Sequence, residues 1–364
     1  MKTITIHRHG NPCHLVAASA GDAPARFYRV ALKTPWWVAA GVFILALGPA
    51  IADDGWSLKP SDKALQVSGE MPDPLNVSGL ASVANGRLVI VGDELRHGLQ
   101  TGRLDLEHGR IVVDQGEFVL LKGNKKELDL EDVSADPRHH CYYACGSCGV
   151  SRKTGEPAPN RQWLFRIETD PTTGAPLPAK VTRASLAAAL RADAFLAKYL
   201  DRDADDMGID VEGLAFKDGR LWVGLRSPNV DGRGIVVAAS ADDLMAGKPV
   251  VFERFELRLG PNLGIRSIEP IKDGFLLICG PTGSKPSKKL PFSLCFWAGS
   301  GERVLRVGEL PRPPVSPGGT DTGGKPEGLL VVSETSEKLG LIVVSDSADN
   351  GAPTLYEVTR PPHP

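Results

Sequence analysis

The fold is indicated most directly by the stretch Val211-Glu-Gly-Leu-Ala-Phe-Lys-Asp-Gly-Arg-Leu-Trp-Val-Gly224. A polar and a small residue follow its first position, and an apolar run lies on each side of Asp218-Gly219. Asp-Gly tolerates the positive φ angles that a tight hairpin turn requires. The two runs are therefore predicted to pair as antiparallel strands.

The same pattern occurs five times along the chain. Its first polar positions are Ser78, Glu131, Glu212, Arg266 and Glu327. Successive positions are 53, 81, 54 and 61 residues apart. A fifth interval, which joins the two ends of the chain, is 62 residues long when the distance from Glu327 to the C-terminus is added to that from residue 53 to Ser78. Units of this size are too small to bury both of their faces, so they are expected to pack against one another.

We therefore predict an all-β fold, a β-propeller of five four-stranded blades. Radial closure protects nearly all strand edges. Because the interval through the two ends matches one unit, an N-terminal strand is expected to complete the last blade. One alternative is a sixth, degenerate blade inside the 81-residue interval, and another is a long β-sandwich.

One inserted helix is predicted near residues 183–200, inside the longest interval. These residues are rich in Ala and Leu, and their apolar side chains fall near helical spacing. Thr182 or Ser185 is a candidate N-cap. Such a helix would lie over the channel mouth or pack on the outside of the propeller.

Residues 1–52 are predicted to be a signal peptide with a long basic leader. Its apolar centre, Trp36 to Leu47, carries no charge and is shorter than the ~20 residues that a membrane-spanning helix needs. Ala50-Ile51-Ala52 offers the small side chains of a cleavage site, so cleavage is expected after Ala52. An uncleaved N-terminal anchor is the alternative. Residues 53–364 would then form a single propeller domain, periplasmic or secreted, without a membrane span after signal cleavage.

The charge balance bears on the class of partner. The chain has 42 Lys and Arg residues against 44 Asp and Glu residues. Five of the basic residues and one acid lie in residues 1–52, so the predicted mature domain is more acidic than the whole chain. An acidic protein has no electrostatic attraction for nucleic acid. We therefore expect a small molecule or another protein as the partner.

The polar repeat positions predict a site. The innermost strands of a propeller line its central channel, so residues that begin these strands are expected to meet at one channel mouth. Converging carboxylates repel one another unless a cation compensates, and Ca²⁺ or Mg²⁺ takes oxygen ligands of this kind. The candidate metal ligands are Glu131, Glu212, Glu327 and, two residues before the first two of these, Asp129 and Asp210. The alternative is that each glutamate accepts backbone N–H groups of the neighbouring blade while Arg266 neutralises the ring.

Two arginines are candidate contacts for an anionic ligand. Arg226 lies in Gly224-Leu-Arg-Ser-Pro228, and Arg266 occupies a repeat position. A guanidinium group binds phosphate or carboxylate with two parallel hydrogen bonds. The alternative is that each arginine pairs with a glutamate of the repeat.

Five cysteines lie outside residues 1–52, and export favours disulfides. Cys279 and Cys295 are expected to face each other across a hairpin and to form one bridge. A second bridge is expected between Cys145 and Cys148 or between Cys141 and Cys148. There are two alternatives. One is a metal site that includes His139 and His140, and the other is that the thiols stay unpaired.

An ordered set of motifs resembles a known family. The set comprises Asp210-Val-Glu-Gly-Leu-Ala215, Gly224-Leu-Arg-Ser-Pro228, Gly264-Ile-Arg266 and Lys325-Pro-Glu-Gly328. It resembles the bacterial proteins grouped as domain of unknown function 3616, over residues 75–346. That resemblance implies a propeller-like exported or cell-envelope protein and supplies no established reaction. Where the family tends to carry a glycine-serine-histidine turn, this chain has Gly146-Ser147-Cys148. The motifs are also similar to those of esterase-like phytase propellers, which implies a metal- and phosphate-linked function.

Several common enzyme motifs are missing from the sequence. It contains no G-x-S-x-G elbow, no Walker loop and no H-E-x-x-H. Two hypotheses remain. The first is an exported propeller that binds a small ligand, a cation or a partner at its channel mouth. The second is a metal-dependent hydrolase of phosphoester or ester bonds at the same mouth.

Overall fold

The structure is a computed structural model that describes residues 2–8, 11–17, 55–283, 289–314 and 323–362. It divides into two compact units, Met1–Leu47 and Gly48–Pro364. In the first unit, β1 (Lys2–Arg8) and β2 (Asn11–Ala17) pair as an antiparallel hairpin. The apolar segment and the cleavage site predicted after Ala52 lie outside the described residues, so the signal peptide stays a prediction. No helix in the described part of the chain has the length and apolar character needed to cross a membrane.

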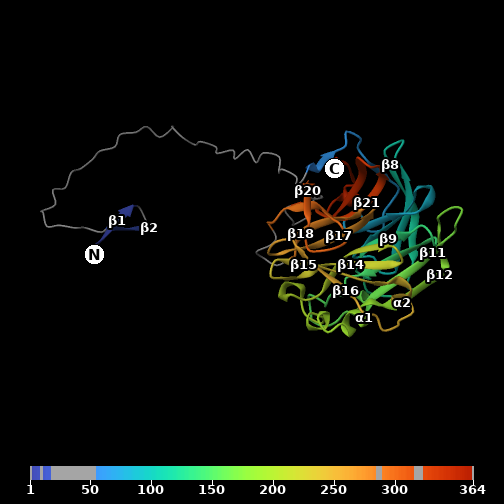
Figure 1. Cartoon of the computed structure of the whole chain (residues 1–364), viewed down its shortest axis with the longest axis horizontal. Coiled ribbons are helices and arrows are strands. Elements are labelled where there is room, and N and C mark those ends of the chain that lie inside the picture. Colours follow the sequence, from blue (N-terminus) through green and yellow to red (C-terminus); the bar gives the residue numbers. More distant parts are fainter. Residues whose placement is uncertain (1, 9–10, 18–54, 284–288, 315–322, 363–364) are drawn as a thin grey trace. The chain divides into compact units, whose positions relative to one another are not determined.

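The second unit is a five-bladed propeller (Figure 1). Blade 1 contains β5 (Val77–Ser82), β6 (Arg87–Gly92), β7 (Gly98–Asp105) and β8 (Arg110–Val119), and β4 (Gln66–Ser68) pairs in parallel with β8. Blade 2 contains β9 (Leu130–Asp136), β10 (Cys141–Gly146), β11 (Trp163–Thr169) and β12 (Pro176–Ser185). Blade 3 contains β13 (Asp210–Lys217), β14 (Arg220–Val230), β15 (Arg233–Ser240) and β16 (Glu253–Arg258).

The last two blades follow the same order from the channel outward. Blade 4 contains β17 (Leu263–Ile271), β18 (Gly274–Pro281), β19 (Phe292–Trp297) and β20 (Leu305–Leu310). Blade 5 contains β21 (Lys325–Glu334), β22 (Lys338–Asp346) and β23 (Thr354–Thr359), and its outer strand is β3 (Ser57–Pro60). The short helices are α1 (Leu186–Ala192), α2 (Ala241–Met245) and the 3₁₀ turns Ala84–Gly86, Pro159–Arg161, Leu196–Lys198, Ala204–Asp206 and Asp349–Gly351.

The ring is closed by its first and last strands. The first strand of each blade contacts the first strand of the next blade, and β21 of blade 5 contacts β5 of blade 1. β3 pairs antiparallel with β23, with Ser57 opposite Thr359. Completion of the last blade by an N-terminal strand is therefore confirmed, as are the five blades. The six-bladed and sandwich alternatives are wrong.

The predicted hairpin turn forms as expected in blade 3. Lys217 pairs with Arg220, and the two residues between them have positive φ angles of 51° at Asp218 and 76° at Gly219. These angles match the right-handed twist of the strands that the turn joins. Apolar side chains from both faces of each sheet then pack against the neighbouring blades, as with Trp222 of blade 3 and Trp297 of blade 4.

The inserted helix is shorter than predicted. Residues 183–185 continue β12, and α1 spans Leu186–Ala192 only. Ser185 caps α1 by accepting a hydrogen bond from the Ala188 N–H at 3.1 Å. The helix stops because the Asp193 carboxylate accepts the N–H groups of the residues two and three positions further on, which starts a new turn.

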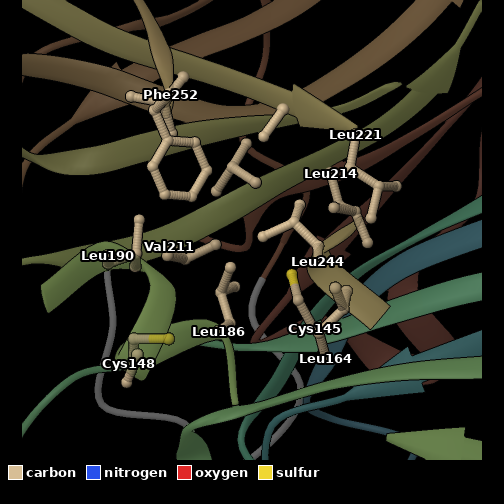
Figure 2. Packing of buried hydrophobic residues seen from close by; sticks show 14 of the residues in the cluster. Cys145, Cys148, Leu164, Leu186, Leu190, Val211, Leu214, Leu221, Leu244 and Phe252 are labelled. Carbon is tan, nitrogen blue, oxygen red and sulfur yellow. The ribbon is translucent and has the colours of Figure 1, made fainter. Parts of the chain in front are cut away.

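The insertion packs between blades 2 and 3. Leu186 and Leu190 of α1 are buried together with Leu164 of blade 2 and Val211 of blade 3 (Figure 2). The turn that follows brings Asp203 and Ala204 to the wall of the channel mouth. Of the two places expected for this segment, the helix itself occupies the groove between blades, and its C-terminal extension reaches the mouth.

Candidate metal and ligand site at the channel mouth

The five repeat positions occupy one structural position. Near the start of the first strand of every blade the pairing register skips one residue, which makes a β-bulge. The skipped residues are Ser78, Glu131, Glu212, Arg266 and Glu327. A bulged residue has no cross-strand partner, and the bulge re-aims its side chain. The bulges thus explain why the repeat places a polar residue among apolar ones.

Glycine follows three of the bulges because neighbouring first strands approach closely. A Cβ atom on Gly213 would lie 3.0 Å from Ile268 Cγ2 of the next blade. A Cβ atom on Gly328 would lie 2.9 Å from the Ser78 carbonyl oxygen of blade 1. These distances leave no room for a side chain. The glycine after each of these glutamates is therefore required by the tight packing of the strands around the channel.

Two buried arginines connect most of the acidic side chains. Arg266 Nε lies 2.8 Å from Glu212 Oε2, and its Nη2 pairs with Glu327. Arg226 pairs through Nη1 with Glu212 and through Nη2 with Asp210. Arg226 is itself the skipped residue of a second bulge, in β14. The pairing of each arginine with a glutamate of the repeat is therefore confirmed.

The backbone-accepting role expected for the glutamates belongs to other residues. The Asp132 carboxylate accepts the Leu214 N–H at 2.9 Å, and Ser134 Oγ accepts the Phe216 N–H at 2.8 Å. Both acceptors lie on β9, beyond the bulge, and both donors belong to blade 3. The bulged glutamates are thus free of this structural task within the described residues.

A second group lies beside the first on blade 2. Arg161 Nη1 lies 3.1 Å from Asp129 Oδ2, and its Nη2 donates to Glu127 Oε1 at 2.8 Å. The Ser147 hydroxyl also donates to Asp129. Among the residues that the structure describes, Glu131 has no ion-pair partner within 4.0 Å. It is the one bulged glutamate whose charge is not matched by an adjacent arginine.

Burial and mutual repulsion shape the protonation of these acids. Burial, followed by repulsion from Asp129 and Glu212, raises the pKa of Glu131 well above its usual range. Burial raises the pKa of Asp129 to about 6, although Arg161 opposes the shift. Burial also raises the pKa of Glu212 against the opposing charges of its two arginines. A cation placed among these groups would favour their ionised forms.

The acids line a cavity of about 380 Å³ at the mouth. One oxygen atom each of Glu131, Asp210 and Glu212 lies within 4.8 Å of the other two. Calcium–oxygen distances of about 2.3–2.6 Å place two ligand atoms of one ion at most about 5 Å apart. The three carboxylates therefore have a spacing that fits a single hard cation. They come from two neighbouring blades, with Glu131 on β9 and the other two on β13.

The structure brings all the predicted acids and both arginines to one mouth, but it divides their roles. Glu327 is bound by Arg266 and does not belong to the close group of three. Several residues of the cavity wall escaped the sequence analysis, namely Asp93, Ser147, Arg161, Lys325 and Asp346. Asp93 and Asp346 lie at the ends of second strands, beside the starts of the first strands. An acid directly after an apolar strand was the signal that could have identified them.

The positions of the cysteines bear on the predicted disulfides. All five that the structure describes are free thiols. Cys295 pairs with Leu277 and Cys279 with Ser293, so the two cysteines are diagonal neighbours across β18 and β19 and not directly opposite. A pairing of Cys279 with Cys295 would place the centre of the β18–β19 hairpin one residue later than it is. The residue opposite Cys279 is therefore Ser293, two positions before Cys295. The Cys279–Cys295 disulfide stays a prediction.

The cysteines of blade 2 lie in an apolar environment. Cys145 and Cys148 are buried in the cluster that α1 covers (Figure 2). Burial raises the pKa of Cys145 well above its usual range, which disfavours the thiolate that a metal would need. The ring of His139 contacts Asp136 at 2.6 Å instead of a thiol. In the described part of the chain, the carboxylates of the mouth are the group with metal-binding spacing.

Solved structures that are similar to this chain include two enzymes of glycoside hydrolase family 43 and one protein of a carbohydrate-active enzyme family. A β-1,3-galactosidase of glycoside hydrolase family 43 has 11% identity and a TM-score of 0.44, over 82% of this chain and 93% of that chain. An endo-arabinanase of the same family from Bacillus licheniformis has 12% identity and a TM-score of 0.39, over 80% and 94%. A calcium structure of a Trichoderma reesei protein of carbohydrate-active enzyme family AA12 has 11% identity and a TM-score of 0.40, over 85% and 96%. Sequence identities and TM-scores this low do not indicate the activity of this chain.

A comparison with curated proteins gives no match. A family model, in contrast, matches residues 164–354, which include the bulges of blades 3, 4 and 5 and both buried arginines. Its description is "Protein of unknown function (DUF3616)". The expected family is thus confirmed: the chain, itself a propeller, belongs to the DUF3616 family.

Proposed function

We propose that this protein is a ligand-binding propeller that holds a divalent cation, Ca²⁺, at its channel mouth. The cation would be bound by Glu131, Asp210 and Glu212. The observation that carries the proposal is the placement of their three oxygen atoms within 4.8 Å of one another. Unpaired, such carboxylates repel one another and must either bind protons or bind a cation.

The charges around the three carboxylates support the proposal. Arg226 forms ion pairs with two of the three carboxylates, those of Asp210 and Glu212, and fixes their positions. Glu131 lacks an adjacent cation among the described residues, and Asp129 makes the largest contribution to the repulsion that it experiences. A divalent ion between Glu131 and the pair would remove this repulsion. Ca²⁺ suits the site better than Mg²⁺ because it accepts irregular carboxylate geometry, whereas Mg²⁺ demands a near-ideal octahedron.

Calorimetric titration of the chelator-treated protein with Ca²⁺ tests the proposal. We expect one site in the wild type and an affinity at least tenfold weaker in Glu131→Gln, which keeps the side-chain shape and removes the charge. Glu107→Gln is the matched control, because Glu107 is exposed on blade 1 outside the mouth. The absence of Ca²⁺ binding by the wild type at millimolar concentrations would overturn the proposal.

Metal-dependent hydrolysis of phosphoester or ester bonds is the second candidate function. The observation that favours it is the position of Arg226, which binds two of the proposed metal ligands and lines the same cavity. A cation and a guanidinium side by side stabilise negative charge that develops on a transferring group. A panel of phosphoesters and esters, assayed with and without EDTA, distinguishes the two functions. Turnover that EDTA and Glu131→Gln abolish supports hydrolysis, and binding without turnover supports the first function.

We also propose that residues 1–52 direct export to the periplasm or the medium. The uncharged segment Trp36 to Leu47 and the small side chains at Ala50 and Ala52 support this. N-terminal sequencing of protein recovered from cell fractions tests it. An N-terminus at Asp53 in an exported fraction is expected, and full-length protein confined to the cytoplasm would contradict it.

A further inference from the structure

A second cavity adjoins the acidic one, and most of its charged lining residues are basic. Its volume is about 470 Å³, and it shares Arg152, Arg226 and Lys325 with the first cavity. Arg266 and Arg312 also line it, so five of its lining residues are basic and two, Asp203 and Asp205, are acidic. Arg226, Arg266 and Lys325 also form ion pairs with carboxylates outside this cavity. Opposite charges thus stand side by side at one channel mouth.

Arg226 lies between the two cavities and faces both. Its Nη1 and Nη2 atoms bind the carboxylates of the acidic cavity. Its Nε atom is buried and has no hydrogen-bond partner among the described residues. This atom lies 4.0 Å from where a Cβ of Gly283 would stand, and Gly283 lines the basic cavity. The arginine side chain is 10% exposed, so the Nε–H is a desolvated donor on the side of the second cavity.

A buried donor without an acceptor is unfavourable, because it loses its hydrogen bonds to water and gains none in their place. Native proteins leave few such groups, and a bound ligand is one way in which they are satisfied. The donor here belongs to a guanidinium, which binds oxyanions more strongly than neutral acceptors. The unsatisfied Nε–H and the surplus of basic side chains point to the same kind of ligand.

The cavity also has an apolar wall. Phe292 and Pro281 line it, and the guanidinium carbons of Arg312 and Arg266 lie 4.6 and 5.7 Å from the centre of the Phe292 ring. The ring thus holds two cations in place through its π-face. A cavity of this size and lining has room for an organic group attached to the anion.

We propose that the basic cavity binds the phosphate or carboxylate group of a small organic anion. Both groups are oxyanions that accept hydrogen bonds from a guanidinium, here Arg226 from the buried side and Arg152 from the exposed side. The proposal deepens the proposed function by naming the ligand class, but it does not require the cation. With Ca²⁺ bound, the anion would lie next to the metal, and the two sites together would select a ligand that tolerates both.

Calorimetric titration of the full chain in EDTA with inorganic phosphate and, separately, with acetate tests the proposal. Ionic strength is kept constant, so that general screening does not change. We expect saturable binding of at least one anion, and the preferred anion identifies the group. Arg152→Gln and Arg312→Gln should each weaken it at least fivefold, while Arg103→Gln, an exposed arginine of blade 1 outside the cavity, should leave it unchanged.

Two outcomes would overturn the proposal. One is the absence of binding of both anions, and the other is equal affinity in the wild type and in both cavity variants. Thermal unfolding of each variant verifies that it is folded, and this is expected for Arg152→Gln because Arg152 is exposed. Because EDTA removes divalent cations, a failure here leaves the Ca²⁺ titration to be judged separately. Likewise, anion binding without Ca²⁺ binding would reject the cation site alone.

Discussion

The Asp132 carboxylate accepts a hydrogen bond from the Ser267 hydroxyl at 3.2 Å. Asp132 belongs to β9 of blade 2 and Ser267 to β17 of blade 4, so the bond joins two blades that are not neighbours in the ring. The same carboxylate accepts the backbone N–H groups of Val133 and of Leu214, which lies in blade 3, each at 2.9 Å. One side chain therefore links three blades through the channel interior. It does so directly beyond the bulge that places Glu131 at the mouth.

Replacing Asp132 by alanine is expected to destabilise the propeller by about 2–4 kcal/mol, because two buried donors of other blades lose their acceptor. Burial raises the pKa of Asp132 well above its usual range, because the buried position disfavours the charged carboxylate. Asp132→Asn, which keeps a carbonyl acceptor, should therefore cost clearly less. Denaturant unfolding of both variants measures the difference. Asp62→Ala on the exposed surface is the control, and an equal loss in all three variants would contradict the prediction.

Stability is expected to fall as the pH rises from about 4.5 to 8, with Glu269 as one cause. Burial raises the pKa of Glu269 to about 8, against a hydrogen bond from the Val331 N–H. The unfolded chain loses this proton near pH 4.5, whereas the folded chain keeps it until about pH 8. Each unit of this difference corresponds to about 1.4 kcal/mol that favours the unfolded state. The contribution is absent below pH 4.5 and complete above pH 8.

The variant Glu269→Gln tests that assignment. Gln keeps an acceptor for the Val331 N–H and cannot ionise, so the variant should match the wild type at pH 4.5 and exceed its stability at pH 9. Chemical unfolding at a series of pH values gives the comparison. A parallel loss of stability with pH in both proteins would show that other groups carry the effect.

Ca²⁺ affinity is expected to rise with pH across the range in which Asp129 and its neighbours titrate. Burial raises the pKa of Asp129 to about 6 and that of Glu131 well above its usual range, so protons compete with the cation. Binding should therefore be weaker at pH 5 than at pH 8. Titrations in two buffers of different ionisation enthalpy report the released protons. An affinity that is constant from pH 5 to 8 would place the cation elsewhere.

Arg226→Gln is expected to reduce stability by about 3–5 kcal/mol in the absence of metal, since it leaves Asp210 without its counterion and removes one of the two arginines that pair with Glu212. Ca²⁺ should then raise the melting temperature of this variant by more than it raises that of the wild type, because the ion replaces the missing positive charge. Differential scanning calorimetry with EDTA and with excess Ca²⁺ measures both shifts. Equal shifts in the two proteins would mean that Asp210 and Glu212 do not bind the ion.

The repeat made much of this architecture predictable. The polar position, the glycine after it and the turn with glycine are local requirements of a bulged hairpin. A polar residue therefore stands at all five bulges, and glycine follows three of them. Five such positions and the matching interval through the ends predicted the blade number, the completing strand and the meeting of Glu131, Glu212 and Glu327. The length of α1 was wrong because Asp193 competes for backbone N–H groups, and a count of helical spacing does not include that competition.

The sequence by itself thus determined the five-bladed ring and which residues enter the channel mouth, because strand alternation, turns and bulges depend on nearest neighbours in the chain. The tertiary structure alone decided how the charges are shared. Arg226 and Arg266 bind Glu212, Asp210 and Glu327 and leave Glu131 without an adjacent cation, because ion pairing depends on distances between side chains of different blades. The same holds for Cys279 and Cys295, where a one-residue difference in the hairpin centre moved two thiols from opposite to diagonal positions.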